Sequence, residues 1–143
     1  MTDQLILKFP SKSLYLKEDY YVSLSNKEAY DFINGWPKWS KRIVNIFGPV
    51  GSGKTHTSSL LQNKTSTIKI QTSDINDKIF PKLKTKEALI IEDFDEKVSE
   101  NLMFSLWNKI LQDNKYLIIT SQKPLINYKF KLKDLNSRIS SCI

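Results

Sequence analysis

Short apolar runs along the chain alternate with segments whose apolar residues recur at helical spacing. Residues 42–47, 67–70, 88–91 and 116–120 are four such runs, rich in β-branched and aromatic residues and short enough to be buried strands. Between the last two runs the sequence predicts a helix whose apolar face is formed by Leu102, Met103, Leu106, Trp107, Ile110 and Leu111. Continuous apolar strands that alternate with helices predict an α/β fold, with a mostly parallel sheet between layers of helices.

Polar residues mark where two of the predicted helices begin. Ser25 and Glu28 form a capping box that opens a helix running to about Ile33, and Gly35 is expected to end it. Ser99 is the expected N-cap of the helix with the apolar face. Both helices therefore have start signals that are independent of their apolar pattern.

Three further segments have weaker signals. Residues 54–62 lack glycine and proline and are expected to be helical, while residues 75–80 are expected to form a helical turn ended by Pro81. Residues 1–18 are expected to be an extended N-terminal arm, which leaves residues 19–143 as the globular core.

One stretch contains three of the chain's four glycines and matches the phosphate-binding pattern G-x-x-x-x-G-K-[ST]; it reads Gly48-Pro49-Val50-Gly51-Ser52-Gly53-Lys54-Thr55. Glycine lets the backbone approach an anion and turn successive N–H groups toward it. Lys54 is expected to reach the β- and γ-phosphates, and Thr55 to bind Mg²⁺. Because this P-loop lies between a predicted strand and a predicted helix, we expect the chain to bind a nucleoside triphosphate or diphosphate.

Two carboxylates follow the apolar run at residues 88–91. Glu92 and Asp93 stand at the carboxyl end of the predicted strand, where ligands bind in open α/β sheets. In the usual pattern the first acid binds Mg²⁺ and the second orients or deprotonates the attacking water. Here the first acid is a glutamate, longer than the usual aspartate, and Asp95 and Glu96 follow, so the assignment of roles among these acids stays open.

Polar residues farther along the chain are also candidates. Thr120, Ser121 and Gln122 stand at the end of a predicted strand that lies beside the P-loop strand in P-loop sheets, so a polar side chain there can contact the γ-phosphate or the water. Arg138 is one of two arginines among 22 basic residues, and its planar guanidinium suits phosphate oxygens. It is either an arginine finger for a neighbouring subunit's nucleotide or a surface residue paired with a carboxylate such as Asp134.

Composition narrows the class of protein. A chain of 143 residues with 40% hydrophobic and 26% charged residues is typical of one soluble domain. It has no apolar run as long as a membrane span, its start is unlike a secretory signal, and its single Cys142 cannot form an internal disulfide, so we expect a cytoplasmic location. The net charge of +7 comes from scattered lysines without a dense basic cluster, so direct DNA binding is expected to be weak or absent.

Together, these residues resemble a known family. The resemblance is carried by the P-loop with His56 after it and by Asp19-Tyr20-Tyr21-Val22-Ser23-Leu24-Ser25-Asn26, Leu89-Ile90-Ile91-Glu92-Asp93, Ile118-Ile119-Thr120-Ser121 and Asp134-Leu135-Asn136-Ser137-Arg138. Over nearly the whole chain they are similar to the AAA+ domain of bacterial DnaA-type proteins, closest to the Hda group of replication regulators in its α-proteobacterial form. The resemblance implies a P-loop NTPase fold of the AAA+ type, ATP or ADP with Mg²⁺ as cofactor, DnaA as a partner and association with the nucleoid and replisome.

The resemblance also implies roles for single residues. Tyr21 and Val22 would flank the adenine, Thr120 and Ser121 would stand at the sensor 1 position, and Arg138 would be the arginine finger.

An N-terminal peptide, Gln4-Leu5-Ile6-Leu7-Lys8-Phe9, resembles the Q-L-x-L-x-[LF] peptide by which Hda and other replication proteins bind the sliding clamp. In an extended segment, Leu5, Leu7 and Phe9 can be apolar anchors and Gln4 a hydrogen-bonding end. From the residues alone, an amphipathic edge strand or a flexible arm is the alternative.

The sequence departs from the family pattern near its end. It stops five residues past Arg138, so we expect the helical lid and its sensor 2 arginine to be absent, and any last strand to be limited to residues 139–143. No helix-turn-helix DNA-binding module is expected either. Hydrolysis by this chain alone should therefore be weak. His56, the single histidine, lies beside the nucleotide-binding residues in the P-loop helix and is expected to be structural rather than catalytic.

These observations give the hypothesis of an adenine-nucleotide-binding AAA+ regulator that binds the sliding clamp and promotes ATP hydrolysis by DnaA, with its own oligomeric state open. One alternative is an autonomous replication ATPase or helicase loader of the DnaA/DnaC type that acts on DNA. A second is a small-molecule kinase, which needs phosphate-clamping arginines and has only Arg138 downstream. A third is a clamp-bound adaptor that holds ADP as a structural ligand.

Overall fold

A computed structural model describes residues 21–140 of the chain. The N-terminal arm 1–18, with Gln4, Leu5, Leu7 and Phe9, lies outside the described residues, as do residues 141–143. The proposed domain division and the clamp peptide therefore stay predictions.

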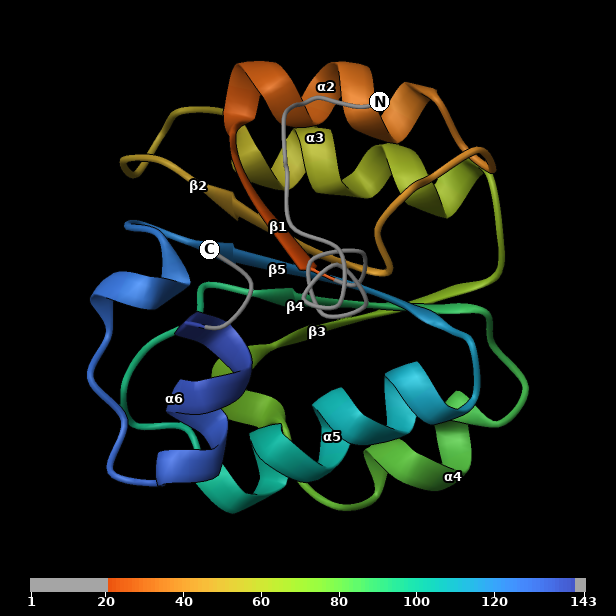
Figure 1. Cartoon of the computed structure of the whole chain (residues 1–143). Coiled ribbons are helices and arrows are strands. Elements are labelled where there is room, and N and C mark those ends of the chain that lie inside the picture. The colour runs from red at the N-terminus through yellow and green to blue at the C-terminus, as the bar shows by residue number, and fades with distance from the viewer. Residues whose placement is uncertain (1–20, 141–143) are drawn as a thin grey trace, which may run out of the picture.

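Within the described part the chain alternates strands and helices (Figure 1). The strands are β1 Tyr21–Ser25, β2 Ile43–Phe47, β3 Thr67–Gln71, β4 Ala88–Glu92 and β5 Tyr116–Ser121. The α-helices are α2 Asn26–Asn34, α3 Lys54–Ser59, α4 Ile79–Leu83, α5 Glu100–Gln112 and α6 Lys133–Ser140. Short 3-10 turns are η1 Leu60–Asn63, η2 Thr72–Asp74 and η3 Leu125–Asn127.

The five strands form one parallel sheet in the order β1-β2-β5-β4-β3. This confirms the α/β fold with a mostly parallel sheet, and each of the four predicted strands is present within a residue or so of its expected bounds. The P-loop strand β2 lies between β1 and β5, so the carboxyl end of β5 stands beside the P-loop, as expected.

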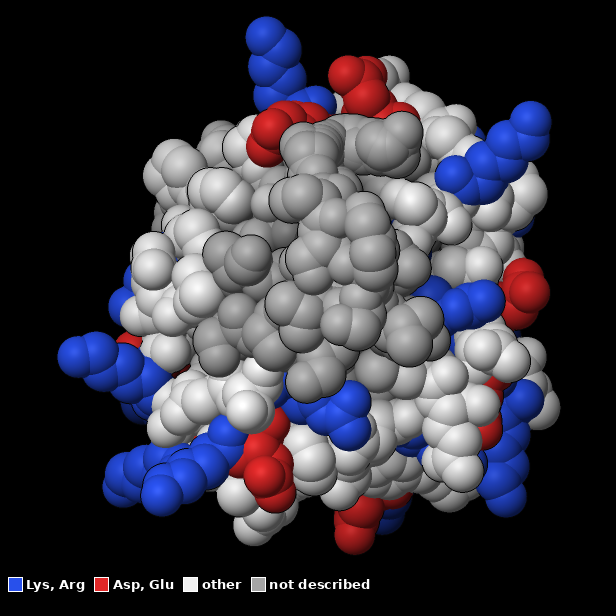
Figure 2. Space-filling model, viewed as in Figure 1, with Lys and Arg blue, Asp and Glu red and all other residues white. Residues whose placement is uncertain are grey.

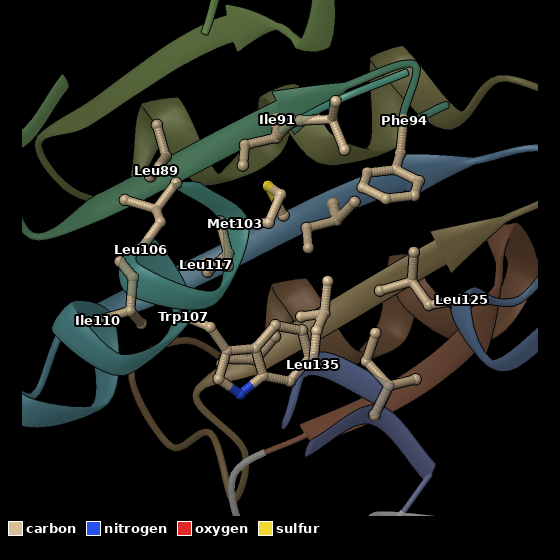
Figure 3. Packing of buried hydrophobic residues seen from close by; sticks show 14 of the residues in the cluster. Leu89, Ile91, Phe94, Met103, Leu106, Trp107, Ile110, Leu117, Leu125 and Leu135 are labelled. Carbon is tan, nitrogen blue, oxygen red and sulfur yellow. The ribbon is translucent and has the colours of Figure 1, made fainter. Parts of the chain in front are cut away.

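Helices cover both faces of the sheet: α2 and α3 lie on one face and α4, α5 and α6 on the other (Figure 1). The first face buries Ala29 and Ile33 of α2 against Val44, Ile46 and Ile118. On the second face α5 packs on the sheet through the residues shown in Figure 3, which include Met103, Leu106, Trp107 and Ile110. Burying a side chain of this size contributes about 1.5–3 kcal/mol. Because helices cover both faces of the sheet, β2, β4 and β5 have apolar side chains on both faces and lack polar alternation.

The start signals of both helices are confirmed. The Glu28 carboxylate accepts hydrogen bonds from the backbone N–H and the hydroxyl of Ser25, both at 3.0 Å. Ser99 Oγ accepts from the Leu102 N–H at 3.3 Å. Gly35 follows α2 as expected, but its φ of −81° is right-handed, so the helix ends there without the left-handed turn that glycine usually supplies.

Two expectations about elements were wrong, and one strand was not predicted. Residues 21–25 form the edge strand β1, which the apolar pattern did not identify. Pro81 lies inside α4 instead of ending a turn before it; it is the third residue of the helix, where an N–H has no intrahelical acceptor and its loss costs nothing. Residues 139–140 belong to α6 rather than to a last strand, because Leu135 and Ile139 share one buried helix face.

Candidate functional site

The P-loop has the backbone conformation that its glycines allow. Gly51 and Gly53 have φ angles of +83° and +92°, in the region that residues with a Cβ rarely adopt. A Cβ on Gly48 would lie 3.0 Å from Ser52 Oγ, so the loop also needs glycine for space at its first position. The loop then enters α3, which begins at Lys54.

The Lys54 ammonium is held by the loop itself. Its Nζ donates to the carbonyl oxygen of Gly48 at 2.6 Å and to that of Pro49 at 2.9 Å, and the residue is 8% exposed. Carbonyl oxygens of the loop therefore fix the position of the Lys54 ammonium.

Asn26, the first residue of α2, supports the loop from the side. Its Nδ2 donates to the Ser52 carbonyl oxygen at 2.8 Å. Asn26 Oδ1 and Ser52 Oγ are buried without a hydrogen-bond partner among the described residues, so the loop has bonding capacity that a ligand or water can use. Sequence reasoning included Asn26 only in the family resemblance and missed this contact.

Glu92, the last residue of β4, is fully buried next to the P-loop helix. Its Oε1 accepts from Thr55 Oγ1 at 3.1 Å and from Thr120 Oγ1 at 3.0 Å, and its Oε2 accepts from Ser58 Oγ at 2.5 Å. The structure thus brings together Thr55 and Glu92, the two residues expected at the metal. Ser58 was not expected there, and no local pattern in the sequence indicates it.

Asp93 turns away from the strand with a φ of +56°, an uncommon conformation that aspartate tolerates better than most residues. Its backbone N–H donates to Thr120 Oγ1 at 2.9 Å, so one hydroxyl holds both Asp93 and Glu92. Asp93 is exposed and Glu92 is buried, so the two carboxylates have different surroundings.

A pocket of about 720 Å³ lies over these elements and is lined by Val50, Gly51, Gly53, Lys54, Thr55, Asp93, Phe94, Asp95, Ser121 and Gln122. It is located at the carboxyl ends of β2, β4 and β5, where open α/β sheets bind ligands. Among the residues that the structure describes, no group of three or more His, Cys, Asp or Glu could hold a metal alone. Oxygen donors from Thr55 and Glu92 fit Mg²⁺, which usually takes one or two protein ligands together with water and substrate phosphates.

Ser121 borders the pocket, but its hydroxyl is engaged elsewhere. It donates to the Lys123 carbonyl oxygen at 2.7 Å and accepts from Asn45 Nδ2 at 2.9 Å. The next residue, Gln122, is exposed and lines the pocket. Gln122 stands with Thr120 and Ser121 at the predicted end of this strand, where a polar side chain was expected to contact the γ-phosphate or the water.

Tyr21 and Val22, the residues expected at the adenine, begin the edge strand β1. The backbones of Tyr21 and Val22 pair with Ile43 and Val44, at the amino end of the sheet, whereas the P-loop follows Phe47. Val22 is thus displaced from the loop by roughly 10 Å along the strand direction at the usual rise per residue. The contact of these two residues with adenine stays a prediction.

His56 and Arg138 are exposed and are not among the residues that line the pocket. The Arg138 guanidinium on α6 lies 5.7 Å from the centre of the Phe104 ring on α5. A cation at this distance from an aromatic face is attracted to it. Arg138 thus lies on α6 beside α5 and does not line the pocket.

A parallel α/β sheet with a preformed P-loop and an acidic neighbouring strand end defines the fold and site of P-loop NTPases. No protein family model matches the chain. It is 27% identical to the chromosomal replication initiator protein DnaA of Borreliella afzelii (strain PKo), over 157 residues that cover 89% of this chain and 32% of that protein. The chain is thus similar to part of this DnaA and spans about a third of its length.

Solved structures give the same fold. Domain III of the Thermotoga maritima replication initiation protein DnaA superposes with a TM-score of 0.61 at 18% identity, covering 93% of this chain and 66% of that one. A structure described as a DNA replication initiation factor matches with a TM-score of 0.56 at 19% identity, covering 80% and 41%. The chain therefore has the fold of DnaA domain III, as the resemblance in its sequence implied.

In the part of the chain that the structure describes, no helix is both long and apolar enough to cross a membrane.

Proposed function

We propose that the chain binds an adenine nucleotide with Mg²⁺ in the pocket over the P-loop. The observation that carries this proposal is the P-loop conformation, with two left-handed glycines and a fixed Lys54 beside the paired Thr55 and Glu92. Backbone N–H groups of residues 51–55 would bind phosphate oxygens, and the Lys54 ammonium would leave its carbonyl acceptors for the β- and γ-phosphates. The bound Mg²⁺ would neutralise phosphate charge in the pocket.

The two acids of β4 would then have separate roles. Glu92, buried and bonded to Thr55, would hold the metal through Thr55 or through water, while Asp93, exposed in the pocket, would orient a water molecule. Gln122 faces the same space. We propose that hydrolysis by this chain alone is weak.

Nucleotide binding is tested by titrating the chain with a fluorescent ATP analogue in Mg²⁺. Replacing Lys54 by Ala should weaken binding at least about tenfold, because the charge-assisted bonds to phosphate are lost. Lys64→Ala, which removes an exposed lysine at the end of η1, is the matched control and should bind as the wild type does. Equal affinity for all three chains would contradict the proposed phosphate site.

In the cell, we propose that the chain regulates replication initiation together with DnaA. The relationship to DnaA supports this part of the proposal, and an exposed Arg138 outside the pocket lining suits an arginine finger that acts on a neighbour's nucleotide. The neighbour is DnaA or a second copy of this chain. The nucleotide in this chain's own pocket would then set the shape of the contacting surface.

Arg138→Ala should leave nucleotide binding unchanged and reduce stimulation of DnaA-dependent ATP hydrolysis about 10³-fold or to background, the range known for arginine fingers. Lys133→Ala removes a cation at the other end of the same helix and should stimulate normally. Unchanged stimulation by the Arg138 variant would remove the proposed finger.

We also propose that the peptide Gln4-Leu5-Ile6-Leu7-Lys8-Phe9 binds the sliding clamp; its apolar alternation supports this. Mixing the chain with purified clamp should give a complex by size-exclusion chromatography at low salt, and replacing Leu5 and Leu7 by Ala should abolish it. A wild-type chain that does not bind would exclude the clamp as its partner.

The relationship to an initiator also favours a second candidate, an autonomous replication ATPase that acts on DNA. It predicts turnover stimulated by DNA and binding that weakens steeply with salt. On the face of the molecule in Figure 2, lysine and arginine side chains stand at separate places around the edge with acidic side chains among them. The basic residues are also scattered along the sequence without a dense cluster, which favours the regulator over the DNA-stimulated ATPase.

A further inference from the structure

The carboxylate of Glu92 is oriented entirely by hydroxyl groups. Its two oxygens accept from Thr55, Ser58 and Thr120 at 2.5–3.1 Å, and Glu92, Ser58 and Thr120 are each 0% exposed. Within residues 21–140 no salt bridge to Glu92 is present. A buried carboxylate that lacks a cation depends on such donors, since an unmade hydrogen bond there is costly.

The length of the side chain explains the position of Ser58. The usual aspartate has one methylene less and could contact Thr55 without extending to the next turn of α3. In Glu92 the extra methylene carries Oε2 to Ser58, three residues after Thr55 and therefore on the same side of the helix. Ser58 Oγ is also 3.0 Å from the Thr55 carbonyl oxygen, but its single proton goes to one acceptor at a time, and the 2.5 Å contact favours the carboxylate.

We propose that Ser58 is a positioning residue of the magnesium–nucleotide site. By holding Oε2 it keeps Oε1 directed at Thr55, the hydroxyl that would ligate the metal. Without Ser58, Oε2 would have no donor and the longer side chain would have no fixed orientation. This inference rests on the proposed binding of a nucleotide. It assigns Ser58 a role only in the part of nucleotide binding that depends on Mg²⁺.

The neighbouring Ser59 provides a matched control. It follows Ser58 on the same helix and its hydroxyl donates to the same Thr55 carbonyl oxygen, at 2.8 Å, but its other contact is Lys69 Nζ rather than Glu92. Removing either hydroxyl deletes one polar atom from α3, and only Ser58→Ala removes a donor to the carboxylate.

The experiment measures the dissociation constant of a fluorescent ADP analogue with Mg²⁺ and with EDTA, together with the urea midpoint of each variant. Ser58→Ala should bind about tenfold more weakly in Mg²⁺ and change less than about twofold in EDTA, the order expected for losing a hydrogen bond to a charged group. Ser59→Ala should keep the wild-type ratio between the two conditions.

A second variant, Glu92→Asp, tests the geometric argument. The shorter carboxylate cannot extend to Ser58, so adding Ser58→Ala to Glu92→Asp should have no further effect on binding in Mg²⁺, whereas additive losses would contradict the pairing.

The outcomes separate this inference from the proposed function. A wild-type chain that binds no nucleotide overturns both. Magnesium-dependent binding by the wild type that Ser58→Ala leaves intact, or that Ser58→Ala weakens equally in EDTA, overturns the role of Ser58 alone.

Discussion

Asn45 is a buried amide in the middle of the P-loop strand, and all its hydrogen-bonding capacity is used. Its Oδ1 accepts from Ser23 Oγ at 2.7 Å and from the Leu125 N–H at 3.0 Å. Its Nδ2 donates to the Ile119 carbonyl oxygen at 3.0 Å and to Ser121 Oγ at 2.9 Å. This one side chain thus joins β1, β5 and the turn after β5, and it takes the hydroxyl of Ser121 away from the pocket.

Replacing Asn45 by Ala should lower the free energy of unfolding by about 2–4 kcal/mol, because the buried Leu125 N–H loses its acceptor and the other partners lose theirs. Urea denaturation followed by circular dichroism measures the change. The control is Asn63→Ala, an exposed amide in η1, which should stay within about 0.5 kcal/mol of the wild type. A wild-type midpoint for the Asn45 variant would show that the network is not stabilising.

Residues such as Asn45 show which single-residue roles can and cannot be predicted from the sequence. The P-loop residues were predictable because their spacing is local and their conformations follow from glycine. The roles of Ser58 and Asn45 were not, because each depends on partners brought together by the sheet. Asn45 lies inside an apolar run and looks in sequence like a defect in a strand.

At the scale of elements, Glu100 ties the start of α5 to the segment before α6. Its Oε1 accepts from the Leu132 N–H at 2.6 Å, and this bond and one from the Lys131 backbone lower the pKa of the Glu100 carboxyl below its usual value of 4.5. A lowered folded-state pKa contributes stability that is present above the unfolded value and is lost as the pH falls through the folded one. The contact between α5 and this segment should therefore weaken in acid.

Glu100→Gln should show this directly. The neutral amide does not titrate, so the stability difference between wild type and variant should be largest near pH 6 and should shrink below about pH 4.5 as the wild-type carboxyl takes up its proton. Urea midpoints at several pH values between 3 and 6 measure it. Asp77→Asn, an exposed acid in the loop before α4, is the control for general charge effects; a constant difference across the range would contradict the assignment.

Elements were predicted well where the apolar pattern is periodic and bounded, as in β4 and α5. β1 was missed because its five residues are only partly apolar, and it is a strand through pairing with β2. α6 was missed because its apolar residues, such as Leu135 and Ile139, are few and widely spaced. Both β1 and α6 thus form through tertiary contacts that the apolar pattern of the sequence does not reveal.

For the whole molecule, stability should be greatest at the centre of the sheet. β2 and β5 have strands on both sides and helices on both faces, whereas β3 is an edge strand whose residues are partly or fully exposed. Hydrogen exchange followed by mass spectrometry should find peptides covering residues 43–47 and 117–121 exchanging last, with residues 67–71 at least about tenfold faster, because edge strands open locally. Equal rates would indicate that the sheet opens only as one unit.

The position of β2 also has a consequence for how the protein is made. Synthesis runs from the N-terminus, so β2 leaves the ribosome next to β1, but its other neighbour follows much later: Asn45 bonds to Ile119, 74 residues farther along. Pairing over such a separation is slow and leaves a nascent chain exposed to aggregation meanwhile. The P-loop strand β2 can therefore pair with β5 only after β5 has been synthesised. A ligand of the P-loop stabilises only chains in which this pairing has formed.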